Sequence, residues 1–371
     1  MLPFVIIALI LILCYYLSLK EKKHKKLILL ISFIILISIT GLRNQTVGAD
    51  SKQYYAIYEQ ISQMNLSQSL TKTLLDSTYM YPLTNIESGY RLYNKIIALF
   101  SPFHQGQWIL MVNSILYFAL LYRFLKHQSK DSQLSLILFV FLGIFQTMLN
   151  MTRIGIAIML CMSSFIFIGK KSYKFIISVF IASTIHFTSI LFIIVPFMKK
   201  HIKMTKLRLL MVFSLLMVIF FKFDSFIALI TKFLPNKYKI YLTSEAATSN
   251  GIEQFLVFGF QLLLVLICTI FIKNTKKEKV KLLNLFGTKI FILEMIFYLL
   301  SIKFVIFGRI AALFMPYVIV YIPELINLLK NNKNRKTLVN IVIILAFIQY
   351  VIRMLVNNIG TTLPYLFFFT K

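Results

Sequence analysis

Long apolar runs alternate with short basic clusters along this chain of 371 residues. Most runs are close to the ~20 residues that an α-helix needs to cross the hydrocarbon core of a membrane. The pattern predicts an all-α fold, a polytopic transmembrane helical bundle of about ten spans. The expected spans are residues 2–19, 27–42, 107–125, 133–150, 153–169, 208–223, 254–272, 282–302, 305–325 and 337–355.

The basic clusters predict the orientation of these spans, because Lys and Arg accumulate in the cytoplasmic loops of membrane proteins. Placing all of the clusters in the cytoplasm gives a consistent map in which the N- and C-termini both lie outside. The clusters are residues 20–26, 123–130, 170–174, 199–208, 273–281 and 330–336.

One apolar segment, residues 174–197, lies between two of these cytoplasmic clusters and must therefore cross the membrane an even number of times. Two full crossings need about 40 residues, which this segment does not have. A re-entrant hairpin with its bend near Ser183 to His186 resolves the conflict. The alternative is that one of the two basic clusters lies outside.

Two outer loops are expected, residues 43–106 and residues 224–253. In the first loop, Arg91, Asn94 and Lys95 share one face of a helical pattern. The apolar residues that recur at helical spacing on the other face are Tyr90, Leu92, Tyr93, Ile96, Ile97 and Phe100. This spacing predicts an interfacial helix on the outer leaflet. Neither an internal repeat nor a low-complexity linker interrupts the chain, so residues 1–371 are expected to form a single integral membrane domain.

The composition supports a membrane protein, with 59% hydrophobic and 14% charged residues. The formal charge of +28 resides in the short clusters between spans, where it orients the chain, so we expect no nucleic-acid partner.

Cys14, Cys161 and Cys268 each lie in an apolar run, which argues against a disulfide framework. The first run lacks a basic leader and a small-residue cleavage site, so it is expected to be retained. The wealth of Lys, Ile, Phe and Asn is typical of an AT-rich bacterial genome.

Three arginines stand at the expected outer membrane ends, where basic residues are unusual. Arg43, Arg153 and Arg309 each follow or open an apolar segment. Arg presents a planar fork of donors that pairs bidentately with phosphate and keeps its charge. Three such groups at one face suggest an anionic ligand, such as a lipid-linked phosphate. The simpler alternative is that each side chain extends to the lipid headgroups.

Several familiar catalytic motifs are missing from the sequence. The four aspartates, Asp50, Asp76, Asp131 and Asp224, stand alone, so there is no DxD pair for a metal-bound nucleotide. Gly169-Lys170-Lys171-Ser172 lacks the upstream glycine of a P-loop, and neither HExxH nor GxSxG occurs. These absences disfavour ATP-driven transport, zinc proteolysis and esterase chemistry, and we expect neither a metal nor a cofactor.

The remaining candidates for chemistry are His186, Asp50 and Glu87. Either His186 or Asp50 could accept a proton from an attacking hydroxyl group, while several arginines stabilise a leaving diphosphate. The structural alternatives are a histidine satisfied within the core, a turn aspartate after Gly48, and, for Glu294, a protonated carboxyl inside the bundle.

Short motifs in a consistent order resemble the EpsG family, which is grouped with Wzy-type polysaccharide polymerases. The resemblance covers most of the chain from about residue 41 onward. One departure is Ile154, at a position where the family often has Gln. The matching stretches are Gly41-Leu42-Arg43, Val47-Gly48-Ala49-Asp50-Ser51 with Tyr54-Tyr55, Glu87-Ser88-Gly89-Tyr90, Thr152-Arg153-Ile154-Gly155-Ile156-Ala157, Ile185-His186-Phe187-Thr188-Ser189, Gly308-Arg309-Ile310, and Leu363-Pro364-Tyr365 with Phe367 to Phe369.

The resemblance implies a glycosyltransferase of the bacterial cell membrane that polymerises capsular, exopolysaccharide or O-antigen repeat units. It would transfer a chain on undecaprenyl diphosphate to the next undecaprenyl-diphosphate-linked oligosaccharide at the outer face. Membrane lipid would surround it, and it could act with a flippase and a chain-length regulator. Arg43, Arg153 and Arg309 would bind the donor, and Glu87 a sugar hydroxyl. His186 or Asp50 would be the base.

Two rival functions belong to other classes. A flippase or carrier of lipid-linked oligosaccharides needs cavity charges that are reachable from both faces, whereas the candidates here gather at one. A membrane acyltransferase also uses a histidine in the bilayer, but nothing in the sequence marks a route for an acyl donor.

Overall fold

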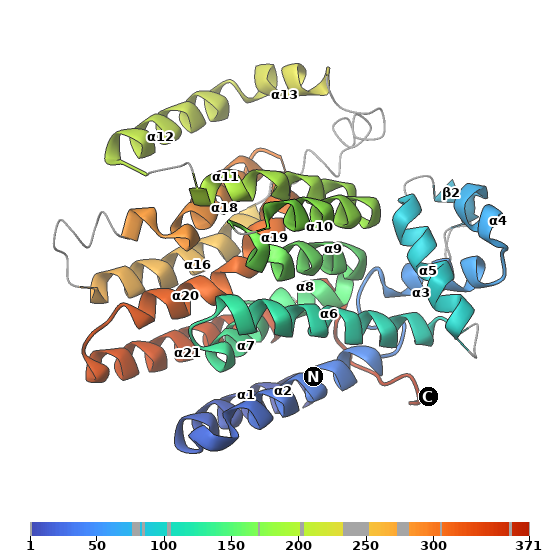
Figure 1. The fold of residues 1–371 in the computed structure, drawn as a ribbon, viewed down its shortest axis with the longest axis horizontal. Coiled ribbons are helices and arrows are strands. Elements are labelled where there is room, and N and C mark those ends of the chain that lie inside the picture. Colours follow the sequence, from blue (N-terminus) through green and yellow to red (C-terminus); the bar gives the residue numbers. More distant parts are fainter. Residues whose placement is uncertain are drawn as a thin grey trace. The chain divides into compact units, whose positions relative to one another are not determined.

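The computed structural model describes residues 2–75, 82–83, 86–101, 105–169, 171–200, 204–232, 252–272, 282–304, 306–355 and 358–370 (Figure 1). Most of these residues are helical, which confirms the all-α class. The strands among them are β1 (Leu74–Leu75) and β2 (Pro82–Leu83), which pair antiparallel in a two-stranded sheet.

The chain divides into two compact units, one of residues 1–193 with 343–371 and one of residues 194–342. The elements of the first unit are α1 (Leu2–Lys20), η1 (Lys22–His24), α2 (Lys25–Gly41), α3 (Ser51–Ser62), α4 (Leu66–Thr71), α5 (Ser88–Phe100), α6 (Gln107–Gln128), α7 (Ser132–Phe141), α8 (Ile144–Asn150), α9 (Thr152–Ser163), η2 (Ser164–Phe167), α10 (Ser172–Ile185), η3 (Phe187–Ile194), and η5 (Ile359–Thr361) with the second half of α21 (Asn332–Leu355). The second unit contains α11 (Val195–Lys200), α12 (Lys206–Phe221), α13 (Phe223–Thr231), α16 (Ile252–Phe271), α18 (Phe286–Ser301), α19 (Ile306–Phe314), η4 (Met315–Tyr317), α20 (Val318–Asn327) and the start of α21.

Fewer helices than expected are long enough to span a membrane. Among the described residues, five helices are long and apolar enough, or up to seven if each of two bent pairs counts as one span. About ten spans is therefore not confirmed. Two apolar runs are bent: α7 and α8 meet at 60° around Gly143, and α12 and α13 meet at 89° around Lys222. The expected span 153–169 forms only a shorter apolar helix, Thr152–Phe167. Gly143 has a φ of +78°, a conformation that glycine adopts without strain.

Helix α7 lies at the centre of the first unit, and every residue from Gln133 to Phe141 is buried. Its start is set by Asp131, whose Oδ1 accepts a hydrogen bond from the amide of Leu134 at 3.2 Å. The ring of Phe139 packs at 6.0–6.2 Å, between centroids, from those of Tyr117, Phe118 and Phe145. This aromatic core ties α6, α7 and α8 together and positions the residues that follow α8.

The helix expected near residue 90 is present as α5, but its polar face is not solvated. Asn94 and Lys95 are buried, and the Lys95 ammonium donates to the carbonyl oxygens of Ser62 and Met64 at the end of α3. The exposed side of α5 is apolar instead, with Leu99 69% and Phe100 81% exposed. An exposed apolar face agrees with a helix at a lipid interface, whereas its polar residues bind protein rather than water.

The break expected within residues 174–197 occurs at the expected position. Helix α10 ends at Ile185, His186 is extended with φ −148° and ψ 112°, and the 3-10 helix η3 begins at Phe187. Whether the segment is re-entrant stays a prediction, as do the orientation of the termini and the single domain. Of the second outer loop, residues 224–253, residues 233–251 lie outside the described part of the chain.

Candidate functional site

Glu87 contacts two of the other residues that the sequence singles out, Arg153 and His186. Its Oε2 lies 2.8 Å from Nη1 of Arg153, and its Oε1 lies 3.7 Å from Nδ1 of His186. The amide of Phe187 also donates to Oε1 at 3.3 Å. All three charged or titratable side chains are only 12–17% exposed. In such surroundings an ion pair is screened less than on an open surface.

Each member of this cluster stands at a helix end. Glu87 precedes α5, Arg153 is in the first turn of α9, and His186 occupies the break between α10 and η3. Backbone at such ends has unpaired groups, so polar side chains gather there without interrupting a helix. The Phe187 amide that reaches Glu87 is an example.

Gly89 allows α5 to approach the end of α10. A Cβ atom at this position would lie 2.2 Å from Oγ1 and 2.6 Å from the carbonyl oxygen of Thr184. Contacts this short are forbidden to any residue with a side chain. The glycine of the Glu87-Ser88-Gly89 stretch therefore holds Glu87 within reach of His186.

Two tyrosines complete the surroundings of Arg153. Its guanidinium lies 5.9 Å from the ring centroid of Tyr90, a cation–π contact, and the Tyr54 ring meets Tyr90 edge-on at 6.0 Å. Burial raises the pKa of Tyr90 to about 12 and also raises that of Tyr54. Both phenols are therefore neutral at physiological pH and suit hydrogen bonding rather than proton abstraction.

Asp50 lies close to this cluster but is held by another residue. Its backbone amide donates to Oδ1 of Asn150 at 2.8 Å. The Asp50 charge also contributes to the raised pKa of Tyr54, and the charge of Arg153 opposes it, so both flank the same phenol. The preceding turn relies on Gly48, whose φ is +99° and whose amide donates to the carbonyl of Thr361.

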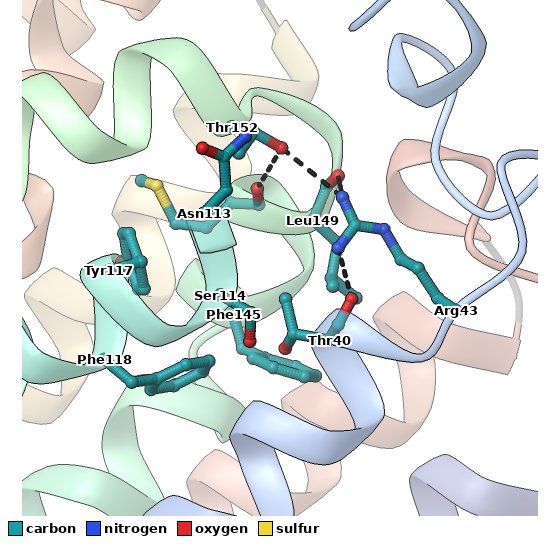
Figure 2. Close-up of a pocket in the computed structure, with 10 residues that line it drawn as sticks. Thr40, Arg43, Asn113, Ser114, Tyr117, Phe118, Phe145, Leu149 and Thr152 are labelled. Atoms are coloured by element: carbon teal, nitrogen blue, oxygen red, sulfur yellow. Dashed lines mark hydrogen bonds between the residues drawn. The ribbon is translucent and has the colours of Figure 1, made fainter. Parts of the chain in front are cut away.

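Arg43 is buried, with 1% of its surface exposed (Figure 2). Figure 2 shows its guanidinium between the carbonyl oxygens of Thr40 at 2.5 Å and Leu149 at 3.2 Å, with Oγ1 of Thr152 at 3.4 Å. Burial lowers its pKa to about 10. The adjoining cavity has a volume of about 10 Å³, the space of roughly one water molecule, so a diphosphate does not fit there.

The C-terminal segment covers the same region. Arg43 and Phe367 form an antiparallel bridge, with hydrogen bonds from Asn44 N to Leu366 O at 2.8 Å and from Phe368 N to Leu42 O at 2.9 Å. Arg43 thus joins the end of α2, the start of α9 and the chain terminus. Its role in substrate binding stays a prediction, and these contacts support a structural role.

Arg309 belongs to the second unit, where it is exposed in the first turns of α19. The proposed convergence of all three arginines therefore stays a prediction. Among the described residues, no group of three His, Cys, Asp or Glu side chains is placed to hold a metal ion.

Sequence reasoning missed two residues that organise this region. Asn150 holds the Asp50 turn, and Arg353 donates from Nη1 to the carbonyl of Leu142 at 2.6 Å, at the break between α7 and α8. Arg353 could have been found, because it also stands at the outer end of an expected span. Asn150 carried no comparable signal.

Long apolar helices with a cluster of charged residues at helix ends define a polytopic membrane protein with a polar site. A family model of the EpsG family matches residues 26–367, so the chain belongs to that family. The family indicates a membrane protein of the polysaccharide-polymerase type. No curated protein and no solved structure matches the chain.

Proposed function

We propose that this protein is a membrane glycosyltransferase that joins undecaprenyl-diphosphate-linked oligosaccharide repeat units at the outer face of the bacterial cell membrane. The observation that carries the proposal is the cluster of Glu87, Arg153 and His186, with their side chains in contact within one unit. The cluster combines a phosphate-binding cation with a potential base, which are the two groups that the reaction needs.

In the proposed reaction, a sugar hydroxyl of the acceptor attacks the anomeric carbon of the donor. The new glycosidic C–O bond forms as the bond between that carbon and the diphosphate oxygen breaks. Polyprenyl diphosphate leaves with the bonding electron pair, and Arg153 stabilises its negative charge through bidentate hydrogen bonds. The hydroxyl proton passes to His186.

Glu87 faces Nδ1 of His186, so Nε2 is the nitrogen left to accept the proton. A carboxylate in this position orients an imidazole ring and stabilises its protonated form. Glu87 also fixes the direction of the Arg153 fork through the 2.8 Å ion pair. These contacts support a positioning role for Glu87, beside the predicted bond to a sugar hydroxyl. Asp50 remains the alternative base.

The direct test is extension of a chemically defined lipid-linked repeat by the purified full-length protein. We expect a ladder of polyprenyl-linked oligomers and release of polyprenyl diphosphate in equal number to the glycosidic bonds formed. If the protein moves labelled repeats across a vesicle membrane without joining them, it is a transporter and the proposal is wrong. Transfer of an acyl group instead would identify an acyltransferase.

A further inference from the structure

A groove with entirely apolar walls runs between α12 and α18 in the second unit. Its walls are Leu209, Leu210, Val212, Phe213 and Leu216 of α12 and Ile292, Met295 and Ile296 of α18. Its volume of about 380 Å³ lies in the range of small-molecule sites, ~300–1,000 Å³. Sugars and phosphates would lose their hydrogen bonds to water in such a groove, so its ligand must be hydrocarbon.

The groove leads toward the hinge between α12 and α13. There Phe223 packs with Leu300, Phe304 and Phe307 in a buried cluster that joins the hinge to α18 and α19. Ile219 and Ile296 both pack against this cluster, so the two walls of the groove converge on it. A chain lying in the groove would therefore end beside the hinge.

The hinge end is rich in cations. The Lys303 ammonium lies 5.1 Å from the ring centroid of Phe220. Two further exposed cations are close in sequence to cluster residues: Lys222 precedes Phe223, and Arg309 follows Phe307 by two residues. Asp224 is the acidic side chain exposed at the same hinge. Among the described residues at this end, three exposed cations and one exposed carboxylate favour an anionic group.

We propose that this groove binds the isoprenoid chain of a polyprenyl diphosphate, with the diphosphate at the end formed by Lys303 and Arg309. The inference rests on the proposed function, which supplies a lipid-linked diphosphate as substrate. The groove accepts the part of the chain next to the headgroup, and the remainder extends into the surrounding lipid. In this proposal Arg309 binds the diphosphate within the second unit. The assignment does not depend on which ligand the Glu87 cluster binds.

Photolabelling of the full-length protein in lipid nanodiscs tests this directly. The probe is a polyprenyl diphosphate with a diazirine on an isoprene unit near the diphosphate and an alkyne tag. We expect the label on the α12 and α18 residues that form the walls of the groove. Val212→Trp or Met295→Phe, which fill the groove from opposite walls, should reduce labelling about tenfold, which is about 1.4 kcal/mol of binding.

Leu215→Trp is the matched control, because Leu215 is on the same helix, 61% exposed and outside the groove. Its labelling should equal that of the unchanged protein, and thermal unfolding of all variants separates a filled groove from a misfolded protein. Lys303→Ala with Arg309→Ala should remove the preference for the diphosphate over a polyprenol probe. Label elsewhere on the chain, unchanged labelling of Val212→Trp, or equal competition by phosphatidylglycerol would each overturn the inference.

The readout is independent of catalysis, so the two proposals can fail separately. A labelled groove in a protein that forms no glycosidic bonds would refute the polymerase and leave the lipid site intact. Efficient polymerisation by a protein whose groove is never labelled would refute the lipid site and support the polymerase.

Discussion

Arg153 and Glu87 form an ion pair of 2.8 Å between the first turn of α9 and the residue before α5. The same carboxylate faces His186 through its other oxygen. One glutamate therefore orients both a cation that can bind phosphate and an imidazole that can accept a proton. This arrangement links the start of α5 to the start of α9 and the end of α10.

The geometry of Arg153 predicts that lysine cannot replace it. Arg153→Lys retains the charge but loses the fork that can bind Glu87 and a phosphate at once, so we expect most polymer to be lost at normal membrane abundance. Arg309→Lys should behave similarly for the lipid diphosphate. Polymer length and amount on gels provide the measurement.

Arg123→Lys is the control for both variants, because Arg123 is exposed and contacts the ring of Phe167, at 5.3 Å, which lysine can also do. If Arg153→Lys makes polymer at the level of this control, Arg153 is an anchor and not a ligand for phosphate. Defective variants of a polymerase should accumulate single lipid-linked repeats on the outer face, where an externally added lectin can bind them.

His186 is predicted to be the base. His186→Gln keeps a polar side chain of similar reach but cannot accept the proton, so turnover should fall about 10²–10⁴-fold. Binding of lipid-linked repeats should be nearly unchanged, because the glutamine still occupies the break before η3. His127→Gln, at an exposed position near the end of α6, should retain full turnover. Wild-type turnover by His186→Gln would instead direct attention to Asp50.

The sequence indicates the break at His186 and singles out the individual charged residues. It does not indicate that Glu87 contacts both Arg153 and His186. The break is visible because residues 174–197 are too short for two crossings and carry polar residues at their middle. Glu87, Arg153 and His186 are far apart along the chain, and only the packing of α5, α9 and α10 brings them together. Nothing in one sequence specifies such packing.

The number of spans and the hydrogen-bond partners of Arg43 could not be predicted either, because both depend on how the helices bend and pack. Counting apolar runs treats each as a straight helix, whereas Gly143 and Lys222 mark bends of 60° and 89°. An arginine at a membrane end was interpreted as a ligand for anions. In the structure Arg43 donates to the carbonyl of Leu149, a backbone group more than a hundred residues away, and sequence patterns contain no information about such a partner.

The buried position of Arg43 predicts a stability defect. Arg43→Ala removes the donors to Thr40 O and Leu149 O and should destabilise the protein by about 1–3 kcal/mol for each buried acceptor left unpaired. We therefore expect a lower unfolding temperature and lower membrane abundance, whereas Lys336→Ala, at an exposed site of α21, should change neither. A normal unfolding temperature with reduced affinity for lipid-linked repeats would contradict this structural role and favour Arg43 as a substrate ligand.

The close approach at Gly89 predicts that a single methyl group inactivates the site. Gly89→Ala places Cβ against Thr184, including its backbone oxygen, so α5 and α10 must separate and Glu87 moves away from His186. Polymer should be largely lost, and Thr184→Gly in the same chain should restore only part of it, because the backbone contact remains. Gly259→Ala in α16 is the control, since its Cβ would meet no atom within 4 Å. Equal activity of both alanine variants would show that the approach of α5 to α10 is not needed.

The expected orientation predicts which positions an impermeant thiol reagent can reach from outside the cell. In a chain lacking Cys14, Cys161 and Cys268, a cysteine at Ser67 in the outer loop should react, because α4 lies beyond the membrane in this topology. A cysteine at Asn334, within a basic cluster, should react only after the membrane is permeabilised. Ser172 is the informative position, because it opens α10, the helix that ends at the break at His186. Protection of this position supports a cytoplasmic start of α10, which the re-entrant interpretation requires. Labelling from outside would place one basic cluster outside and make residues 174–197 a simple crossing.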